Sequence, residues 1–139
     1  INDLRHLKKL IEASKTEIGT LAAVIDDQSK INNENIVKVI TDSKVTSKNF
    51  PFAIDFKRKI NNLNLNIYHH LGVYAYRPEV LKKLIKFKQT NNEIKNRLEQ
   101  LRAIENGIKI NVGLAKFCPI GVDTMEDYLA LKKKLEYNS

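Results

Sequence analysis

The sequence predicts an α/β fold in which a mixed, mostly parallel sheet is flanked by helices. Segments with apolar residues at helical spacing occur near both ends and in the middle of the chain, and short apolar or β-branched runs lie between them. Such alternation is typical of sheets whose strands are connected through helices. The chain has 139 residues, which is enough for one core, so we expect a single domain over residues 1–139.

The first half of the chain is expected to contribute one helix and three strands. Leucines and Ile11 recur at helical spacing, so residues 3–14 are expected to form an amphipathic helix. The continuous apolar run at 18–25 favours a buried strand, and 36–40 and 53–60 are expected to be strands as well. Polar loops are expected between these elements, at 26–35, 43–50 and 61–66.

The second half is expected to add two strands and three helices. Residues 68–77 are aromatic and β-branched, which favours a strand, and Pro78 fits the first position of a helix. A further helix is expected to open at Thr90 and to stop at Gly107, and 108–115 alternates as a strand does. The apolar residues expected on the buried faces of the last two helices are Ile94, Leu98, Leu101, Ile104, Tyr128, Leu129, Leu131 and Leu135.

The stretch 121–127, GVDTMED, precedes the last predicted helix. Thr124 and Asp127 have the spacing of a capping box, so both are expected to bond the first turn of that helix. Asp123 is left over at the end of a predicted strand, where ligands of open α/β sheets bind. Its carboxylate can serve a metal ion or a hydroxyl, or it can be an ordinary charge at a helix N-terminus.

Composition limits the classes of partner. The net charge of +8 raises the possibility of nucleic-acid binding, but lysines greatly outnumber arginines, and arginine with interleaved aromatics is what such sites favour. We therefore expect no nucleic-acid partner. No apolar run approaches the ~20 residues of a membrane span, so we expect no membrane partner. The single cysteine, Cys118, fits a reducing compartment and thus the cytoplasm.

Two further segments carry candidate site residues. Strand alternation places His70, Gly72, Tyr74 and Tyr76 on one face. Gly72 leaves room for a ligand, and His70 and Tyr74 can hydrogen-bond a polyhydroxylated substrate. The alternative is an aromatic face packed on helices. In the segment 97–102 the two leucines are expected in the core, and Glu99, Gln100 and Arg102 are expected to face either a pocket or water.

Together the three segments resemble one family, 3-deoxy-manno-octulosonate (Kdo) cytidylyltransferase, or CMP-Kdo synthetase. Its patterns H-x-G-x-Y-x-Y-R, L-E-Q-L-R-x-x-E-N-G-x-x-I and G-V-D-T-x-E-D stand here at residues 70–77, 98–110 and 121–127. The resemblance implies a Rossmann-like fold of the nucleotide-diphospho-sugar transferase type. It also implies that the chain matches the C-terminal part of the cytidylyltransferase domain, with the N-terminal nucleotide-binding half absent.

The resemblance also implies a reaction. The family is a nucleotidyltransferase that transfers CMP from CTP to Kdo, releasing pyrophosphate, for lipopolysaccharide biosynthesis; it is a cytoplasmic homodimer that needs Mg²⁺. Asp123 matches the catalytic, magnesium-binding Asp of the family. His70, Tyr74, Glu99 and Gln100 match positions that bind the sugar.

The departures from the family pattern matter for activity. The basic loop that holds the triphosphate, the cytosine-binding segment and the second metal-binding Asp have no counterpart in these residues, so we expect this chain alone to be inactive. One alternative is a non-catalytic sugar-binding or dimerising remnant of the enzyme. A basic nucleic-acid-binding domain is a further alternative.

Overall fold

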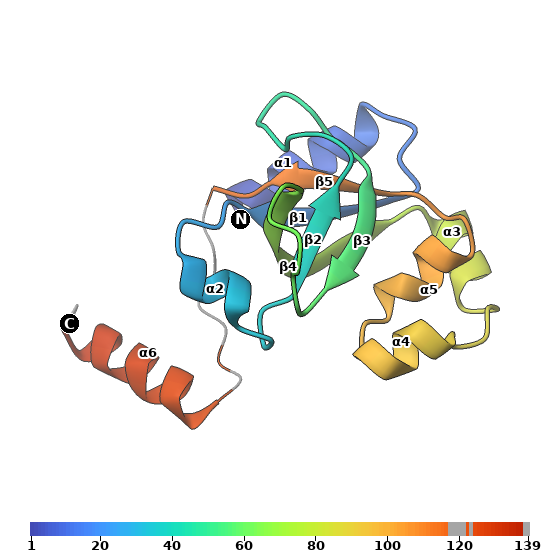
Figure 1. Ribbon diagram of the computed structural model, residues 1–139. Helices are drawn as coiled ribbons and strands as arrows, with labels where there is room; N and C mark the ends of the chain where they lie inside the picture. The colour runs from blue at the N-terminus through green and yellow to red at the C-terminus, as the bar shows by residue number, and fades with distance from the viewer. Residues whose placement is uncertain (117–121, 123, 138–139) are drawn as a thin grey trace.

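The computed structural model describes residues 1–116, 122 and 124–137. The strands of these residues form one five-stranded sheet in the order β3-β2-β4-β1-β5 (Figure 1). The strands are β1 (Ile18–Ala23), β2 (Lys38–Thr41), β3 (Ala53–Lys57), β4 (Asn66–Tyr76) and β5 (Ile110–Leu114). The helices are α1 (Asn2–Glu12), α2 (Gln28–Asn32), α3 (Pro78–Leu84), α4 (Asn91–Asn96), α5 (Gln100–Glu105) and α6 (Met125–Tyr137).

The sheet is mixed, as predicted, but it is not mostly parallel. Only β1 and β5 pair in parallel, whereas β1 with β4, β2 with β3 and β2 with β4 pair antiparallel. The reason lies in the connections. The connection from β2 to β3 contains no helix, whereas a parallel pair needs a crossover, usually through a helix. β4 does not pair with β3, which precedes it in the chain, but lies between β2 and β1 and pairs antiparallel with both.

The two faces of the sheet are covered by different helices. On the first, the α1 face, Leu7 of α1 packs against Leu21 of β1 and Ala115. On the second, the cavity face, Val80 of α3 and Leu101 of α5 join a larger core cluster built on the strands. In Figure 1, α3, α4 and α5 accordingly lie together at one side of the sheet.

Two predictions in the connecting segments were wrong. The expected loop at 26–35 contains α2, because the carboxylate of Asp27 caps that helix by accepting from the Ser29 N–H at 2.9 Å. The single helix expected from Thr90 to Gly107 is broken at Arg97 into α4 and α5. The break interrupts the expected apolar stripe, so Leu98 is buried whereas Ile94 is 58% exposed.

Helix α6 begins as predicted but packs differently. The Thr124 hydroxyl accepts from the Asp127 N–H at 3.1 Å, and the Asp127 carboxylate accepts from the Thr124 N–H at 3.0 Å, which confirms the capping box. The expected inward face is wrong, because α6 lies outside the sheet layers (Figure 1) and both Tyr128 and Leu129 are at least half exposed. Leu135 is exposed as well, and Leu131 is partly buried.

Among the described residues, no helix has both the length and the apolar character that crossing a membrane requires.

Candidate functional site

An irregularity in β4 shapes the cavity face. Thr20 pairs with Tyr74 and Ala22 pairs with His70, so between these two pairs β4 contains two more residues than β1 does. Gly72 lies in this bulge with a φ of 67°, a left-handed conformation that glycine adopts without steric cost. The bulge therefore sets the spacing between the His70 and Tyr74 rings.

The bulge borders a cavity of about 440 Å³, which we call the His70 cavity. It is lined by residues of β4 and of the segment that links α4 to α5, and Leu84 of α3 lines it as well. All four residues predicted to bind the sugar line it. Its polar lining consists of His70, Tyr74, Tyr76, Arg97, Glu99, Gln100 and Arg102.

Aromatic rings form a continuous row along this side of the sheet. The ring of Phe56 meets His70 edge-on with centroids 4.9 Å apart, His70 lies 5.3 Å from Tyr74, and Tyr74 lies 5.8 Å from Tyr76. The alternative of an aromatic face packed wholly against helices does not hold for this row, because the last three of these residues line the cavity.

The His70 ring is buried and makes a hydrogen bond with Thr20. Its Nε2 lies 2.9 Å from the hydroxyl of Thr20, and that hydroxyl donates to the backbone carbonyl of Val73 at 2.7 Å. Burial, with a smaller contribution from His69, lowers the pKa of His70 to about 4. The ring is therefore a neutral imidazole at neutral pH.

The two tyrosines are protonated hydroxyl donors. Burial raises the pKa of Tyr74, and the neighbouring Tyr76 and Glu99 raise it further. Burial and Glu99 likewise raise the pKa of Tyr76. The cavity thus combines neutral hydroxyl and imidazole groups with the exposed carboxylate of Glu99 and the amide of Gln100.

The break between α4 and α5 brings Glu99 and Gln100 to the cavity. Arg97 has φ 53° and ψ 48°, and this left-handed residue ends α4 as the Leu98 N–H bonds back to the Glu93 carbonyl at 3.2 Å. Arg102 reaches across the break to Glu93, with its Nε 2.9 Å from Oε2 and a second contact from its Nη2. The hydrogen bond from Arg102 lowers the pKa of the Glu93 carboxyl and outweighs burial, which raises it.

Asp123, the predicted catalytic and magnesium-binding residue, lies outside the described residues. Among the described residues, no group of three or more His, Cys, Asp or Glu side chains is arranged to hold a metal ion.

Two basic residues donate hydrogen bonds to backbone carbonyls. Arg77 donates to the carbonyls of Ile11, Ser14 and Thr16 and so ties the end of α1 to the end of β4. Lys38 is fully buried and donates to the carbonyls of Asn33, Ile36 and Arg58.

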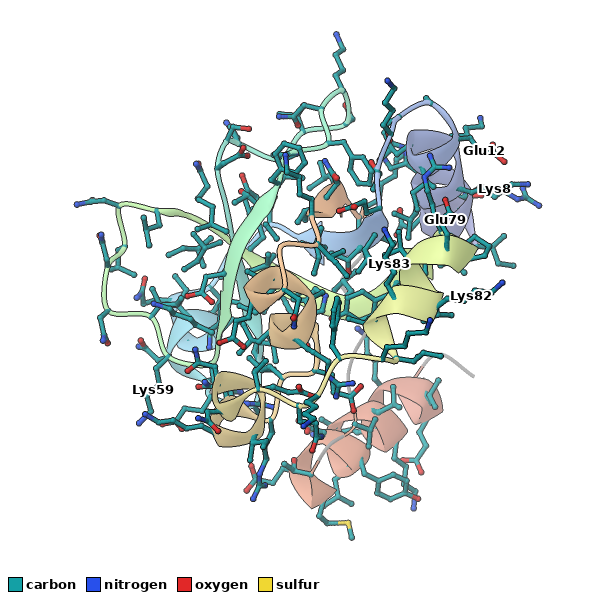
Figure 2. The ribbon with its side chains drawn as sticks, turned by 90° about the vertical axis from the view of Figure 1, so that its right-hand side faces the viewer. Lys8, Glu12, Lys59, Glu79, Lys82 and Lys83 are labelled. Atoms are coloured by element: carbon teal, nitrogen blue, oxygen red, sulfur yellow. The ribbon has the colours of Figure 1, made fainter. Side chains whose placement is uncertain are left out.

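Other cations are dispersed over the surface. Figure 2 shows Lys8 on α1, Lys82 on α3 and Lys59 after β3 at separate places on the periphery. Lys8 pairs with Glu12, and Lys59 pairs with Glu34.

The sequence profile of the cytidylyltransferase family matches residues 3–110, most of this chain. The chain belongs to the cytidylyltransferase family. Both walls of the His70 cavity, β4 and the α4–α5 segment, fall inside the matched part.

Curated relatives of this cytidylyltransferase-family chain include 3-deoxy-manno-octulosonate cytidylyltransferases. The protein of Bartonella tribocorum is 37% identical over 134 residues, which cover 96% of this chain and 54% of the relative. That of Thermodesulfovibrio yellowstonii is 38% identical over 137 residues, covering 93% of this chain and 54% of the relative. The chain thus spans about half the length of the curated relatives it matches.

A solved structure of CMP:2-keto-3-deoxy-manno-octonic acid synthetase complexed with CTP has the same fold. It superimposes with a TM-score of 0.80 at 24% sequence identity, over 99% of this chain and 57% of that one. The predicted fold type is therefore confirmed, with the correction to strand direction given above.

Sequence reasoning missed three residues of the site. Tyr76 was expected on the same face as His70 and Tyr74 and could have been assigned to the site on that basis. Arg97 could not, because nothing in a helical run marks an arginine for a left-handed conformation. Thr20 lies 50 residues before His70 in the chain, and only the pairing of β1 with β4 brings the two together.

Proposed function

We propose that this chain supplies the acidic-sugar part of the active site of a Kdo cytidylyltransferase, which transfers CMP from CTP to Kdo and releases pyrophosphate for lipopolysaccharide biosynthesis. One observation carries the proposal. His70, Tyr74, Glu99 and Gln100 come from two distant segments and line a single cavity.

The chemistry of the cavity suits a polyhydroxylated acid. Tyrosine hydroxyls, a neutral imidazole, an amide and a carboxylate offer hydrogen bonds of both directions to sugar hydroxyls. The guanidinium of Arg97 lines the same cavity and can attract the carboxylate of such a sugar. A volume of about 440 Å³ is in the range of small-molecule sites.

The proposal extends to the rest of the reaction. Mg²⁺, when bound, neutralises the triphosphate and helps to activate the attacking hydroxyl, and Asp123 is the residue of this chain proposed to hold it. The role of the described residues is to bind and orient the sugar, so that its anomeric hydroxyl is presented toward the CTP side of the site.

Calorimetric titration of Kdo into the chain tests the sugar site. Gln100→Ala removes amide hydrogen bonds from the cavity and is expected to weaken Kdo binding about fivefold. Gln28→Ala makes the same change on exposed α2 and should leave the Kd unchanged. Absence of Kdo binding by the unaltered chain, or equal weakening by both variants, contradicts the proposal.

A pyrophosphate-release assay with CTP, Kdo and Mg²⁺ tests the expectation for the chain alone. We expect no turnover above background, because the sequence contains no counterpart of the triphosphate- and cytosine-binding segments of the family pattern. Turnover would show that these 139 residues suffice. A sugar-binding remnant predicts the same Kdo affinity, whereas a nucleic-acid-binding domain predicts steeply salt-dependent affinity for DNA or RNA and none for Kdo.

The homodimer and the cytoplasmic location are also proposed. Helix α6 exposes Met125 by 71% and Leu129 by 54%, and a second copy can bury such a face. Sedimentation analysis of the chain tests the dimer, and a purely monomeric species at all concentrations would contradict it. The cytoplasmic location rests on the lone cysteine of the sequence and on the family resemblance.

A further inference from the structure

The hydroxyl of Thr20 on β1 contacts two residues of the β4 bulge, His70 and Val73. It is fully buried, 2.7 Å from the Val73 carbonyl oxygen and 2.9 Å from His70 Nε2. A hydroxyl carries one proton, and a carbonyl oxygen can only accept, so the Thr20 proton is committed to Val73. The contact with His70 is then a hydrogen bond that the ring must donate.

This direction fixes which nitrogen of His70 carries the proton. The ring is neutral and so carries one N–H, which stands on Nε2, and Nδ1 is left with its lone pair. No buried side-chain nitrogen or oxygen of the described residues lacks a hydrogen-bond partner, and the ring of His70 makes its hydrogen bond at Nε2. Nδ1 is therefore the ring atom that His70 presents to the cavity it lines.

We propose that Thr20 is a positioning residue that locks His70 in the Nε2–H form, so that Nδ1 accepts a hydrogen bond from a hydroxyl of the bound ligand. A neutral lone pair repels carboxylate and phosphate oxygens, which have no proton to donate. The position next to His70 is thus specific for a hydroxyl, and the acidic group of the ligand binds elsewhere in the cavity. This last step rests on the proposed function.

The tautomer can be measured without any ligand. Long-range proton–nitrogen correlations of the imidazole in the ¹⁵N-labelled chain at pH 7 report which ring nitrogen is protonated. The unaltered chain and Thr20→Ser, which keeps the hydroxyl, are expected to show His70 protonated on Nε2. Thr20→Val keeps the shape but removes the acceptor, so the proton is expected to move to Nδ1, where it can reach the cavity.

Either of two results overturns the proposal: an Nδ1–H ring in the unaltered chain, or an unchanged Nε2–H ring in Thr20→Val. If Thr20→Val does not fold, the unaltered chain and Thr20→Ser still decide, because an Nδ1–H ring in either contradicts the assignment. A general loss of packing would not move a proton between ring nitrogens, so the readout separates positioning from a merely structural role.

Sugar titrations complete the test. Thr20→Val is expected to weaken Kdo binding about fivefold to tenfold, and Thr20→Ser to restore it. If His70 is Nε2–H but Kdo does not bind the unaltered chain, the proposed function fails while the Thr20 arrangement stands. If Kdo binds and Thr20→Val leaves both affinity and tautomer unchanged, the inference fails while the proposed function stands.

Discussion

On β1 and β4, neighbouring residues face opposite sides of the sheet, and the two sides are filled differently. On the α1 face, a Cβ added to Gly19 would lie 2.7 Å from the end of Ile11, and one added to Gly113 would lie 3.0 Å from Leu10. On the cavity face, a Cβ added to Gly72 would meet nothing within 4 Å. Glycine therefore permits close packing on one face and a bulged backbone beside open space on the other.

The side chains of β4 are also divided between the two faces, with apolar ones on the α1 face and polar ones on the cavity face. Leu71, Val73 and Ala75 of β4 pack toward the α1 face, while His70 and Tyr74 line the cavity. One strand thus contributes to a sealed core and to a site, because successive side chains alternate in direction. Substitutions one residue apart on this strand should therefore affect either folding or ligand binding, depending on the face that the side chain occupies.

Acidification is expected to have the largest effect. The folded pKa of His70, about 4, lies below its ordinary value of 6.5, so the unfolded chain binds the proton more readily. The stabilisation is fully present above pH 6.5 and is lost as the pH falls toward 4, by about 3 kcal/mol at most. Urea unfolding at pH 7 and pH 4.5 measures the difference.

The variant His70→Gln isolates this effect, because an amide can donate to Thr20 but does not titrate. Between pH 7 and pH 4.5 the free energy of unfolding of His70→Gln should fall less than that of the unaltered chain, and the difference should be most of the His70 contribution. Equal pH dependence of the two proteins would show that His70 is not buried in the neutral form.

Overpacking the α1 face is expected to have the second largest effect on the free energy of unfolding. Gly19→Leu places a branched side chain against Ile11 and Leu7, and should lower the free energy of unfolding by about 2 kcal/mol. Thermal unfolding measures the cost. The Kd for Kdo of the folded variant should not change, because Gly19 faces away from the cavity. A large loss of affinity would mean that the two faces are coupled.

Gly72→Ala should cost less, about 1 kcal/mol, because the penalty is conformational and no atom obstructs the methyl group. Gly107→Ala is a matched control, since Gly107 also has a positive φ, 75°, and open space around it. Urea unfolding should give similar costs for both. Only Gly72→Ala is expected to weaken Kdo binding, and equal binding by both variants would argue against a ligand beside the bulge.

Tyr74→Phe is expected to affect folding least, by under about 0.5 kcal/mol, because the phenyl ring keeps the row of rings intact. The lost hydroxyl should weaken Kdo binding about fivefold by titration. Tyr128→Phe makes the same change on exposed α6 and should be neutral in both measurements. A Kd unaffected by Tyr74→Phe would remove this hydroxyl from the sugar site.

Local patterns were readable from the sequence because their causes are local. The capping box predicted at Thr124 depends on two residues three positions apart and is present, and a helix opens at Thr90 as expected. The strands were found within a few residues, and the four sugar-site candidates were brought into one cavity.

What escaped prediction depends on contacts between distant segments. Strand direction follows from which strands pair, and the pattern of one strand does not encode its neighbour. The break at Arg97 is bridged by the ion pair of Glu93 with Arg102, so it reflects packing between two helices rather than helix propensity. Thr20 became part of the site only through the pairing of β1 with β4.

Chemical-shift mapping of Kdo on the ¹⁵N-labelled chain tests the central claim most directly. Amide signals are expected to change in two separate segments, 70–76 and 97–103, while those of Leu7, Ile11 and Gly113 on the α1 face remain in place. Saturable changes confined to these two segments would support a sugar site in the His70 cavity. Changes centred on the α1 face, or none at saturating Kdo, would contradict it.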